Sequence, residues 1–514
     1  MKLNAATLSD GYKLSHGKMY ADGTTMVYSN LTPRSDRIHK KNATPFYDGK
    51  LVWVGAQGAI REIHEAFEEF FKSPKEKVVG RFARRMEGYL GGYEPAVKAI
   101  SELHDLGYLP LKIKAIKEGS KVNFGIPVMT VRNTVPEFYW LTNYLETVIS
   151  NLTWKVATNA TIANEYRNIV EHYGDKTGTD AFTRSIQCHD FSMRGMSGPE
   201  DSARAGFGHL LSFIGTDTLP AMDYAEDYYD ADGLIAISVP ATEHAVATSN
   251  ILYAEKVLAD IPGSRLAAEE AFMYDLITRK FPSGIVSYVA DSFDFWAVLT
   301  DILPNLKDVI LAREASNVAP GKLVIRPDSG DPVKVICGDE DAPIGSPEHK
   351  GAIEVLWETF GGTTTEKGYK MLDSHIGLIY GDSITTKRAE EILRRLADKG
   401  FASGNVVFGI GSYTYQCNTR DNFGFAVKAT YTEVGDEGIA IFKDPKTDSK
   451  KKSAKGLLFV GYNTDGGGNF FLQDNVSLEE EESQDNLLRT IFEDGKFFNV
   501  QTLSDVRKTL GWIV

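Results

Sequence analysis

Side chains of several chemical types gather in the stretch 187–219 of this 514-residue chain. The stretch holds the aromatic ring of Phe191, the guanidinium of Arg194, the carboxylate of Asp217 and the imidazole of His189. Arginine presents a planar fork that binds phosphate oxygens, and a carboxylate accepts hydrogen bonds. Singly, a Phe more often lies in a core and an Asp more often caps a helix. Together they indicate a binding site, because Arg194 and Asp217 are expected at adjacent strand ends.

Polar or glycine-rich segments also end the other short apolar runs between about 180 and 425. The runs are 213–214, 234–239, 285–290, 323–325, 376–380 and 406–410, and the segments that end them read GTDT, PATEH, ADS, RPDSG, GDS and GIGS. In (β/α) barrels the carboxyl ends of all the strands face one mouth, where catalytic groups gather. An open sheet would more often concentrate its chemistry at a single switch point. The pattern therefore favours a barrel.

Amphipathic stretches alternate with these runs and predict helices over 242–260, 266–279, 293–304 and 384–399. Alternation of strands and helices is typical of a parallel sheet. We therefore predict an α/β fold in which residues 156–425 form an irregular TIM-like (β/α) barrel.

The two ends of the chain have a different pattern of predicted strands and helices. Near the N-terminus we expect strands over 111–116 and 127–131 and a helix over 60–71, and beyond residue 426 strand-like runs alternate with glycine turns. The prediction is a second, discontinuous α+β domain made of residues 1–155 and 426–514. The basic segment 446–455 (KTDSKKKSAK) is expected to be a solvated loop or, alternatively, a flap that contacts phosphate.

The bulk composition excludes several classes of protein. Lys and Arg total 56 against 70 Asp and Glu, a formal charge of −14, so neither nucleic acid nor an anionic membrane is an expected partner. An anionic substrate would need a locally basic pocket. The three cysteines fit neither a zinc site nor a disulfide framework. No secretory signal or membrane span is recognisable, which predicts a cytoplasmic protein.

Common nucleotide and metal motifs are absent: there is no GxxxxGK[ST] loop, no HExxH pair and no EF-hand loop. Seven other motifs occur in order: HDFSMRG, GTDT, SVPATEH, VADSFD, IRPDSGDP, YGDSI and FGIGS. With SDGYKLSHGKMY, FYWLTNYLET and FKDP elsewhere, they span nearly the whole chain. In this set the sequence resembles the nicotinamide phosphoribosyltransferases, a type II phosphoribosyltransferase family related to nicotinate phosphoribosyltransferase.

The resemblance implies a ring-binding site and a shared active site. Phe191 would stack on one face of nicotinamide, and Tyr12 of the partner subunit in a homodimer would stack on the other. Asp217 would accept hydrogen bonds from the carboxamide and repel the carboxylate of nicotinate. Arg326 is a further ring-binding position.

The resemblance also implies phosphate-binding positions for phosphoribosyl diphosphate. Mg²⁺ would be held by the diphosphate, with Asp328 or Asp291 as candidate protein ligands. The implied positions are Arg194, Arg326, Asp328, Gly381, Asp382, Gly411, Ser412, Arg420, Lys428, Arg34 and Lys443.

His244 matches the family's histidine that is phosphorylated by ATP, so ATP is implied as a co-substrate. Glu243 and Asp291 would orient its imidazole. Three features depart from the family pattern: Ser412 where glycine is usual, Gly377 where an arginine is expected, and an unusual segment at 333–368.

Two other functions compete with this interpretation. Nicotinate phosphoribosyltransferase shares the fold and the chemistry, and Asp217 is the residue that argues against it. A pyridine-nucleotide sensor without turnover is a rival of another class. The presence of His244, Asp291, Arg326 and Asp328 together argues against the sensor, since simple binding does not need a phosphorylatable histidine.

Overall fold

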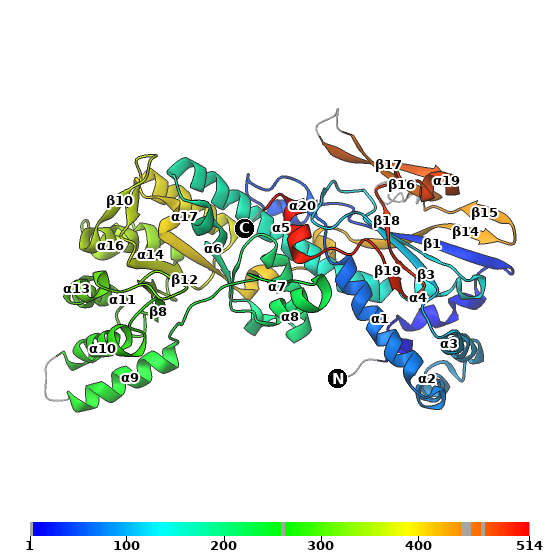
Figure 1. The fold of residues 1–514 in the computed structure, drawn as a ribbon, viewed down its shortest axis with the longest axis horizontal. Coiled ribbons are helices and arrows are strands. Elements are labelled where there is room, and N and C mark those ends of the chain that lie inside the picture. Colours follow the sequence, from blue (N-terminus) through cyan, green and yellow to red (C-terminus); the bar gives the residue numbers. More distant parts are fainter. Residues whose placement is uncertain (1–3, 259–262, 444–453, 464–467, 513–514) are drawn as a thin grey trace.

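The computed structural model describes residues 4–258, 263–443, 454–463 and 468–512. It has two main sheets joined by one long helix, α5 (Glu146–Thr177) (Figure 1). Residues 446–453 of the predicted basic loop lie outside the described residues. Across the described part of the chain, every helix is too short or too polar to cross a membrane.

The first sheet combines strands from both ends of the chain. Its seven strands are largely antiparallel and run in the order β15 (Glu437–Ala440), β14 (Ala426–Val434), β1 (Thr24–Thr32), β5 (Met129–Asn133), β3 (Leu111–Ala115), β18 (Arg489–Glu493) and β19 (Lys496–Phe497). In β1 the run from Met26 to Leu31 is buried throughout, as expected of a strand covered on both faces. The strands predicted at 111–116 and 127–131 are therefore present, and both lie inside this sheet.

The same two ends of the chain also form helices and two short strand pairs. The helices are α1 (Ala56–Lys72), α2 (Lys75–Leu90), α3 (Glu94–Leu106), α4 (Leu141–Tyr144), α19 (Leu478–Glu482) and α20 (Leu503–Leu510). The paired strands are β2 (Leu51–Val52) with β4 (Lys121–Val122) and β16 (Leu457–Asn463) with β17 (Asn469–Val476). In α1 the buried side chains Ile60, Ile63, Phe67 and Phe70 recur at helical spacing, which explains why this predicted helix forms.

The second sheet is parallel and has six strands. Their order is β7 (Gly215–Thr216), β6 (Cys188–Asp190), β13 (Val406–Ile410), β12 (Ile376–Tyr380), β9 (Lys322–Arg326) and β8 (Ile285–Val289). The intervening helices are α6 (Ala181–Ile186), α7 (Pro199–Leu210), α8 (Pro220–Tyr229), α9 (His244–Val257), α10 (Ser264–Asp275), α11 (Phe295–Ala297), α12 (Leu303–Asn305), α13 (Lys307–Leu311), α14 (Pro332–Cys337), α15 (Pro347–Lys350), α16 (Ala352–Phe360), α17 (Thr386–Asp398) and α18 (Ser412–Gln416). Strands β10 (Gly362–Thr364) and β11 (Lys370–Leu372) form a separate hairpin.

The predicted α/β class is confirmed, but the parallel sheet is not a closed barrel. The run 234–239 was expected to be a strand, and only Ile237 and Ala241 of this neighbourhood form bridges, one to Gly215 and one to Ser287. This segment thus lies between the edge strands β7 and β8 without forming a ladder. Pro240, which has no N–H to donate, interrupts it. The parallel sheet is therefore a half-barrel with β7 and β8 at its two ends, and the prediction of a TIM-like barrel is corrected accordingly.

Three buried clusters meet on α5. Ile149 and Leu152 pack in the core of the antiparallel sheet, while Ile162 and Tyr166 pack in the core of the parallel sheet. Val156, between them, belongs to a third cluster with α7, α8 and α20. The helix measures ~48 Å at 1.5 Å per residue. The predicted domain boundary at residue 155 falls inside this continuous helix.

Candidate active site

A cavity of about 1040 Å³ lies at the carboxyl ends of the parallel strands. Its walls come from the segments that follow β6, β7, β9, β12 and β13. Nine of the predicted site residues line it together: Phe191, Arg194, Asp217, Arg326, Asp328, Gly381, Asp382, Gly411 and Ser412. Parallel strands bring these separated motifs to one edge, as expected.

The ring of Phe191 forms one wall of the cavity. A Cβ at Gly409 would lie 2.5 Å from this ring and 2.8 Å from the Cα of Gly381, so a glycine is required there for the backbone to pass beneath Phe191. The backbone N–H of Phe191 donates to the carbonyl of Ile410 at 2.9 Å, which fixes the residue to β13. The aromatic face is thus held rigidly, as a stacking surface must be.

Asp217 is held through one of its two oxygens. His189 Nε2 lies 2.9 Å from Oδ1, and the Ser238 hydroxyl donates to the same atom at 2.5 Å. Oδ2 makes no hydrogen bond within the described part of the chain. Burial opposes ionisation, but the contacts of His189 and Ser238 and the charge of Arg326 outweigh it, so the pKa of Asp217 is lowered. The cavity therefore contains a charged carboxylate with one oxygen ready to accept hydrogen bonds.

Three guanidinium groups line the same cavity as this acid. Arg326 ends β9 and donates from Nη2 to the carbonyl of Thr242 at 3.1 Å, while its buried Nε has no partner among the described residues. Arg194 is exposed and forms no ion pair with any described residue. Arg388, which was not predicted, also lines the cavity and donates from Nη1 to the carbonyl of Ser383 at 2.8 Å. An acidic protein thus has a locally basic pocket, as an anionic substrate requires.

The loop after β12 approaches the loop after β9 closely. A Cβ at Gly381 would lie 2.4 Å from Asp328 Oδ1, so a side chain there would displace the carboxylate. Ser383 has a positive φ of 57°, which is uncommon for a residue other than glycine, and its hydroxyl donates to Asp382. Thr385 then caps α17 by accepting a hydrogen bond from the N–H of Arg388.

Asp328 lies in a negatively charged part of the cavity. Burial is the main reason that the pKa of Asp328 is raised, and the neighbouring charges of Asp291 and Asp382 add to it against Arg326. A cation would relieve this repulsion. No group of three or more His, Cys, Asp or Glu able to hold an ion occurs among the described residues. A divalent ion would fit here only if a bound molecule supplied most of its oxygen ligands.

His244 begins α9 beside the cavity rather than within its lining. Its Nε2 lies 3.1 Å from Asp291 Oδ1, so the two side chains are in contact. The His244 side chain is 47% exposed, whereas that of Asp291 is 6% exposed. Glu243 is exposed and precedes the helix, and no hydrogen bond joins it to His244 within the described structure.

Five predicted binding residues do not line this cavity. Arg34 and Arg420 lie at the turn 420–425, where Arg34 Nε donates to the carbonyl of Gly424 at 2.9 Å. Lys428 is an exposed residue of β14 opposite Asn30. Lys443 is also exposed. Tyr12 is 63% exposed on the 3₁₀ helix η2 (Gly11–Lys18).

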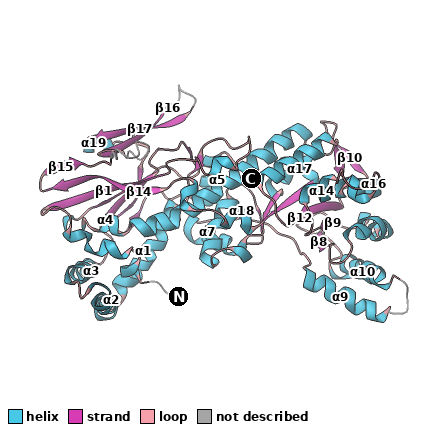
Figure 2. Cartoon of the chain, turned by 180° about the vertical axis from the view of Figure 1, so that it is seen from behind, coloured by secondary structure: helices cyan, strands magenta, loops and turns pink. Residues whose placement is uncertain are grey.

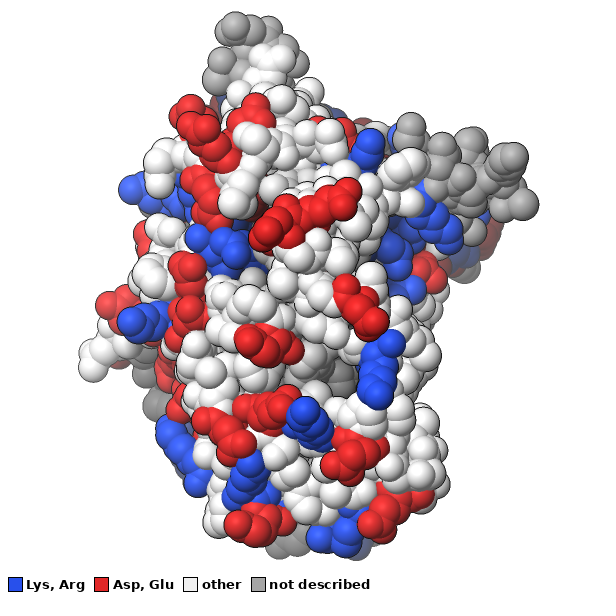
Figure 3. Space-filling view, turned by 90° about the vertical axis from the view of Figure 1, so that its right-hand side faces the viewer, with Lys and Arg blue, Asp and Glu red and all other residues white. Residues whose placement is uncertain are grey.

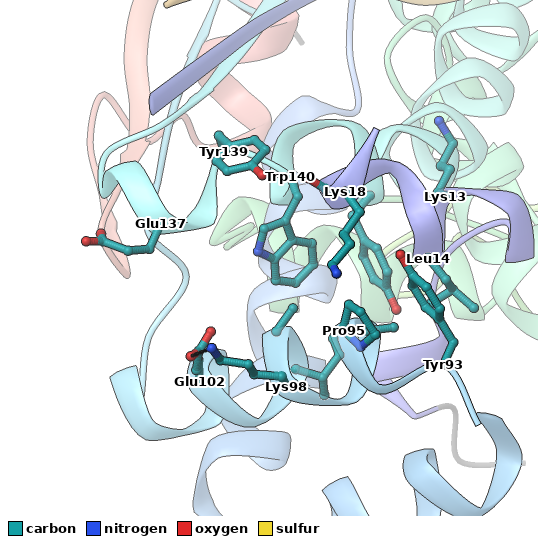
Figure 4. A pocket seen from close by; sticks show the side chains of 15 residues that line it. Lys13, Leu14, Lys18, Tyr93, Pro95, Lys98, Glu102, Glu137, Tyr139 and Trp140 are labelled. Carbon is teal, nitrogen blue, oxygen red and sulfur yellow. Dashed lines mark hydrogen bonds and ion pairs between the residues drawn. The ribbon is translucent and has the colours of Figure 1, made fainter. Parts of the chain in front are cut away.

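A second cavity of about 280 Å³ lies beneath η2, against α3. Figure 4 shows the ammonium of Lys18 pointing into it beside the indole of Trp140. Lys13 is buried and ion-paired with Glu146 at 2.8 Å, which anchors η2 to the start of α5. The anchored side of η2 faces the protein, and Tyr12 faces outward.

A buried hydrogen-bond chain supports the cavity from below. His209 Nε2 lies 3.0 Å from the carbonyl of Gly215 in β7, so this nitrogen carries the proton. Nδ1 then accepts from the hydroxyl of Tyr415 in α18 at 2.6 Å. Burial lowers the pKa of His209 to about 4, so the ring stays neutral. The chain ties the strand before Asp217 to the helix after Gly411.

Residues missed from the sequence are mainly hydroxyls and one arginine. Thr218, Thr385, Tyr413, Thr414 and Arg388 line the cavity. The predicted helix 384–399 already places Arg388 in its first turn, directly after the GDS segment. That position was the signal that could have identified it.

Comparison with known proteins places these features in a family. Residues 186–496 match the model of the nicotinate phosphoribosyltransferase (NAPRTase) family. The chain is 50% identical to a nicotinamide phosphoribosyltransferase of Acinetobacter baylyi over 99% of this chain and 97% of that protein. It is 34% identical to a nicotinamide phosphoribosyltransferase of Mycoplasma pneumoniae over 87% of this chain and 93% of that protein. The crystal structure of human nicotinic acid phosphoribosyltransferase shares the fold, with a TM-score of 0.55 and 16% identity over 98% of this chain and 93% of that chain.

Proposed function

The chain belongs to the nicotinate phosphoribosyltransferase family, and we propose that it is a nicotinamide phosphoribosyltransferase. It transfers the phosphoribosyl group of phosphoribosyl diphosphate to nicotinamide, forming nicotinamide mononucleotide and diphosphate in NAD salvage. One observation carries this proposal: a single cavity combines the ring of Phe191, the free oxygen of Asp217 and three arginines.

Asp217 selects the amide over the acid. Its Oδ2 accepts a hydrogen bond from the carboxamide NH₂ of nicotinamide stacked on Phe191. The carboxylate of nicotinate would instead meet a second negative charge in a half-buried pocket, where repulsion is poorly screened. The lowered pKa of Asp217 keeps that charge in place at neutral pH.

The reaction is a displacement at the anomeric carbon. The pyridine nitrogen forms a bond to this carbon while the bond to the diphosphate oxygen breaks, and the ring nitrogen becomes positively charged. Negative charge grows on the leaving diphosphate, and Arg194 and Arg326 stabilise it by hydrogen bonds aimed into the cavity. Asp328 accepts hydrogen bonds from the ribose hydroxyls.

Mg²⁺ fits the acidic side of the cavity when diphosphate supplies most of its ligands. Asp328 or Asp291 would contribute the protein oxygen, since burial and mutual repulsion already raise the pKa of Asp328. The ion would neutralise charge on the leaving group. The protein's own part is to hold these carboxylates and the arginines in place.

ATP is proposed as a co-substrate through His244. Asp291 accepts the Nε2 proton, which leaves Nδ1 with its lone pair available as a nucleophile. Transfer of the terminal phosphoryl group to His244 would couple ATP hydrolysis to ring transfer. Glu243 lies next to His244 in sequence and would assist only after a change of rotamer.

A homodimer with shared active sites explains the residues outside the cavity. Tyr12 is exposed and does not line the cavity of its own subunit, so it would stack on the ring held by the partner subunit. Arg34, Arg420, Lys428 and Lys443 would likewise serve the partner's phosphate groups. We propose the same two-part division as before, residues 1–155 with 426–514 and residues 156–425, in a cytoplasmic enzyme.

A product assay tests the proposal. The purified protein is incubated with phosphoribosyl diphosphate, Mg²⁺ and either nicotinamide or nicotinate, with and without ATP, and both mononucleotide and diphosphate are quantified. We expect nicotinamide to be the preferred base and ATP to increase turnover. Preference for nicotinate would reassign the enzyme to the acid substrate, and binding without diphosphate release would reduce it to a sensor.

A further inference from the structure

Arg388 stands in the first turn of α17 with most of its guanidinium unused. Its Nη1 donates to the carbonyl of Ser383, and no other side-chain hydrogen bond or ion pair of Arg388 occurs within the described residues. The side chain is partly buried and lines the cavity opposite Tyr413 and Thr414 of α18. Neighbouring arginines of the parallel region behave differently, since Arg184 and Arg204 are paired with carboxylates.

The position of this charge is unfavourable in the protein alone. The N-terminus of a helix carries partial positive charge, so acidic residues are the usual occupants of a first turn. The first turn of α17 has no acidic residue and instead contains Lys387 and Arg388. An anion bound there would satisfy the helix terminus and the guanidinium together.

Two hydrogen bonds hold the loop between β12 and α17 in place. Arg388 holds the carbonyl of Ser383, whose φ of 57° is otherwise strained. The Thr414 hydroxyl donates to the carbonyl of Ile384 at 3.1 Å, which fixes the same loop to α18. A rigid loop, a free guanidinium and the threonine hydroxyls suit a tetrahedral oxyanion.

From these contacts we infer that Arg388 binds the 5′-phosphate of the phosphoribosyl group. This inference rests on the proposed function, because it assigns one end of the same substrate. The reacting end is already occupied by Phe191 and Asp217, with Arg326 beside them. The segment 381–388 therefore receives the phosphate at the other end of the ribose. The same group is present in substrate and product, so Arg388 binds both.

The role differs from that of the arginines at the leaving group. A contact made equally in the ground state and the transition state changes KM more than kcat. Loss of a charge-assisted, bidentate contact weakens binding about 10- to 100-fold. The affected ligands are those that carry the 5′-phosphate.

The test compares a phosphorylated ligand with its unphosphorylated counterpart. Isothermal titration calorimetry measures binding of nicotinamide mononucleotide and of nicotinamide riboside to the full-length wild type, Arg388→Gln and Arg388→Lys. Arg394→Gln is the matched control, because Arg394 lies on the same helix, half exposed and paired with Asp398. We expect Arg388→Gln to weaken the mononucleotide about 10- to 100-fold while the riboside affinity stays constant, with Arg388→Lys intermediate.

Each outcome decides a separate question. Equal mononucleotide binding by wild type and Arg388→Gln overturns the assignment of Arg388. An equal loss for mononucleotide and riboside also overturns it, since that result means Arg388 only maintains the loop. Failure of the wild type to bind the mononucleotide at all counts against the proposed function itself.

Discussion

The two sheets use their charged side chains in opposite ways. In the antiparallel region Lys112, Lys114 and Arg132 bind Glu481 and Glu482 at 2.9–3.5 Å, so these five charges are all paired. Its outer face carries acidic and basic side chains interspersed (Figure 3). In the parallel region Arg194, Arg326 and Arg388 face a cavity with free N–H groups. We therefore expect ligands to bind where the fold leaves charges unpaired.

Removing a cation should therefore unfold one region and disable the other. Lys114→Met leaves Glu481 buried without its ion-pair partner, and breaking such a pair costs about 3–5 kcal/mol of folding free energy. We expect denaturant titration to show this loss while kcat/KM per folded molecule stays at the wild-type value. A large drop in kcat/KM at unchanged stability would contradict the comparison.

Arg326→Ala should have the reverse profile. Loss of a donor aimed at developing charge reduces kcat/KM about 100- to 1000-fold, which is about 3–4 kcal/mol. The free energy of unfolding should change little, because Arg326 forms one hydrogen bond, to Thr242. Steady-state formation of the mononucleotide measures the first quantity and thermal unfolding the second. Wild-type turnover in this variant would remove Arg326 from the leaving-group site.

Asp217→Asn tests whether the charge of Asp217 sets the preference for nicotinamide over nicotinate. The amide keeps the shape of the side chain but removes the charge that repels nicotinate. The ratio of kcat/KM for nicotinamide to that for nicotinate should fall about 10- to 100-fold. Competition between the two bases in one reaction measures this ratio directly. An unchanged ratio would assign base selection to another residue.

The smallest effect concerns pH. Burial opposes ionisation of Glu482, but hydrogen bonds from Lys112 and Arg132 and the charge of Lys114 lower its pKa to about 2. An acid with a lowered folded pKa contributes stability above its unfolded value of 4.5, and the contribution is lost as the pH falls toward 2. Glu482→Gln should flatten the stability profile over that window by about 1 kcal/mol or less. An unchanged acid limb would show that Glu482 is not linked to folding.

The ends of most parallel strands could be predicted because buried strands appear in the sequence as short runs of apolar residues. The runs 285–290, 376–380 and 406–410 became β8, β12 and β13 within a residue or two, and the polar residues after them met at one edge. The run 234–239 does not form a strand: Ile237 makes a single bridge to Gly215, Leu234 is exposed, and Ile235 packs with α7 and α8. Apolar character reports burial and cannot distinguish a strand from an extended segment.

The cavity itself was harder to complete from the sequence. His189 and Ser238 share one oxygen of Asp217 although they lie on different segments, and no spacing rule links them. Arg388 was overlooked because an arginine on an amphipathic helix usually faces solvent. Only the three-dimensional structure distinguishes Arg388, which lines the cavity, from other arginines of α17 such as Arg394, which is paired with Asp398.

The helix α5 has a practical consequence for anyone who wishes to divide the protein (Figure 2). Both sheets pack against the same continuous helix, so an expression product that starts near residue 156 would begin about a third of the way along it. Such a fragment would lose Val52, Val54, Leu503 and Val506 from the cluster around Val156. The complementary fragment would keep only the first turns of the helix. Neither region is expected to fold as a separate fragment, so this enzyme has to be engineered as the intact chain.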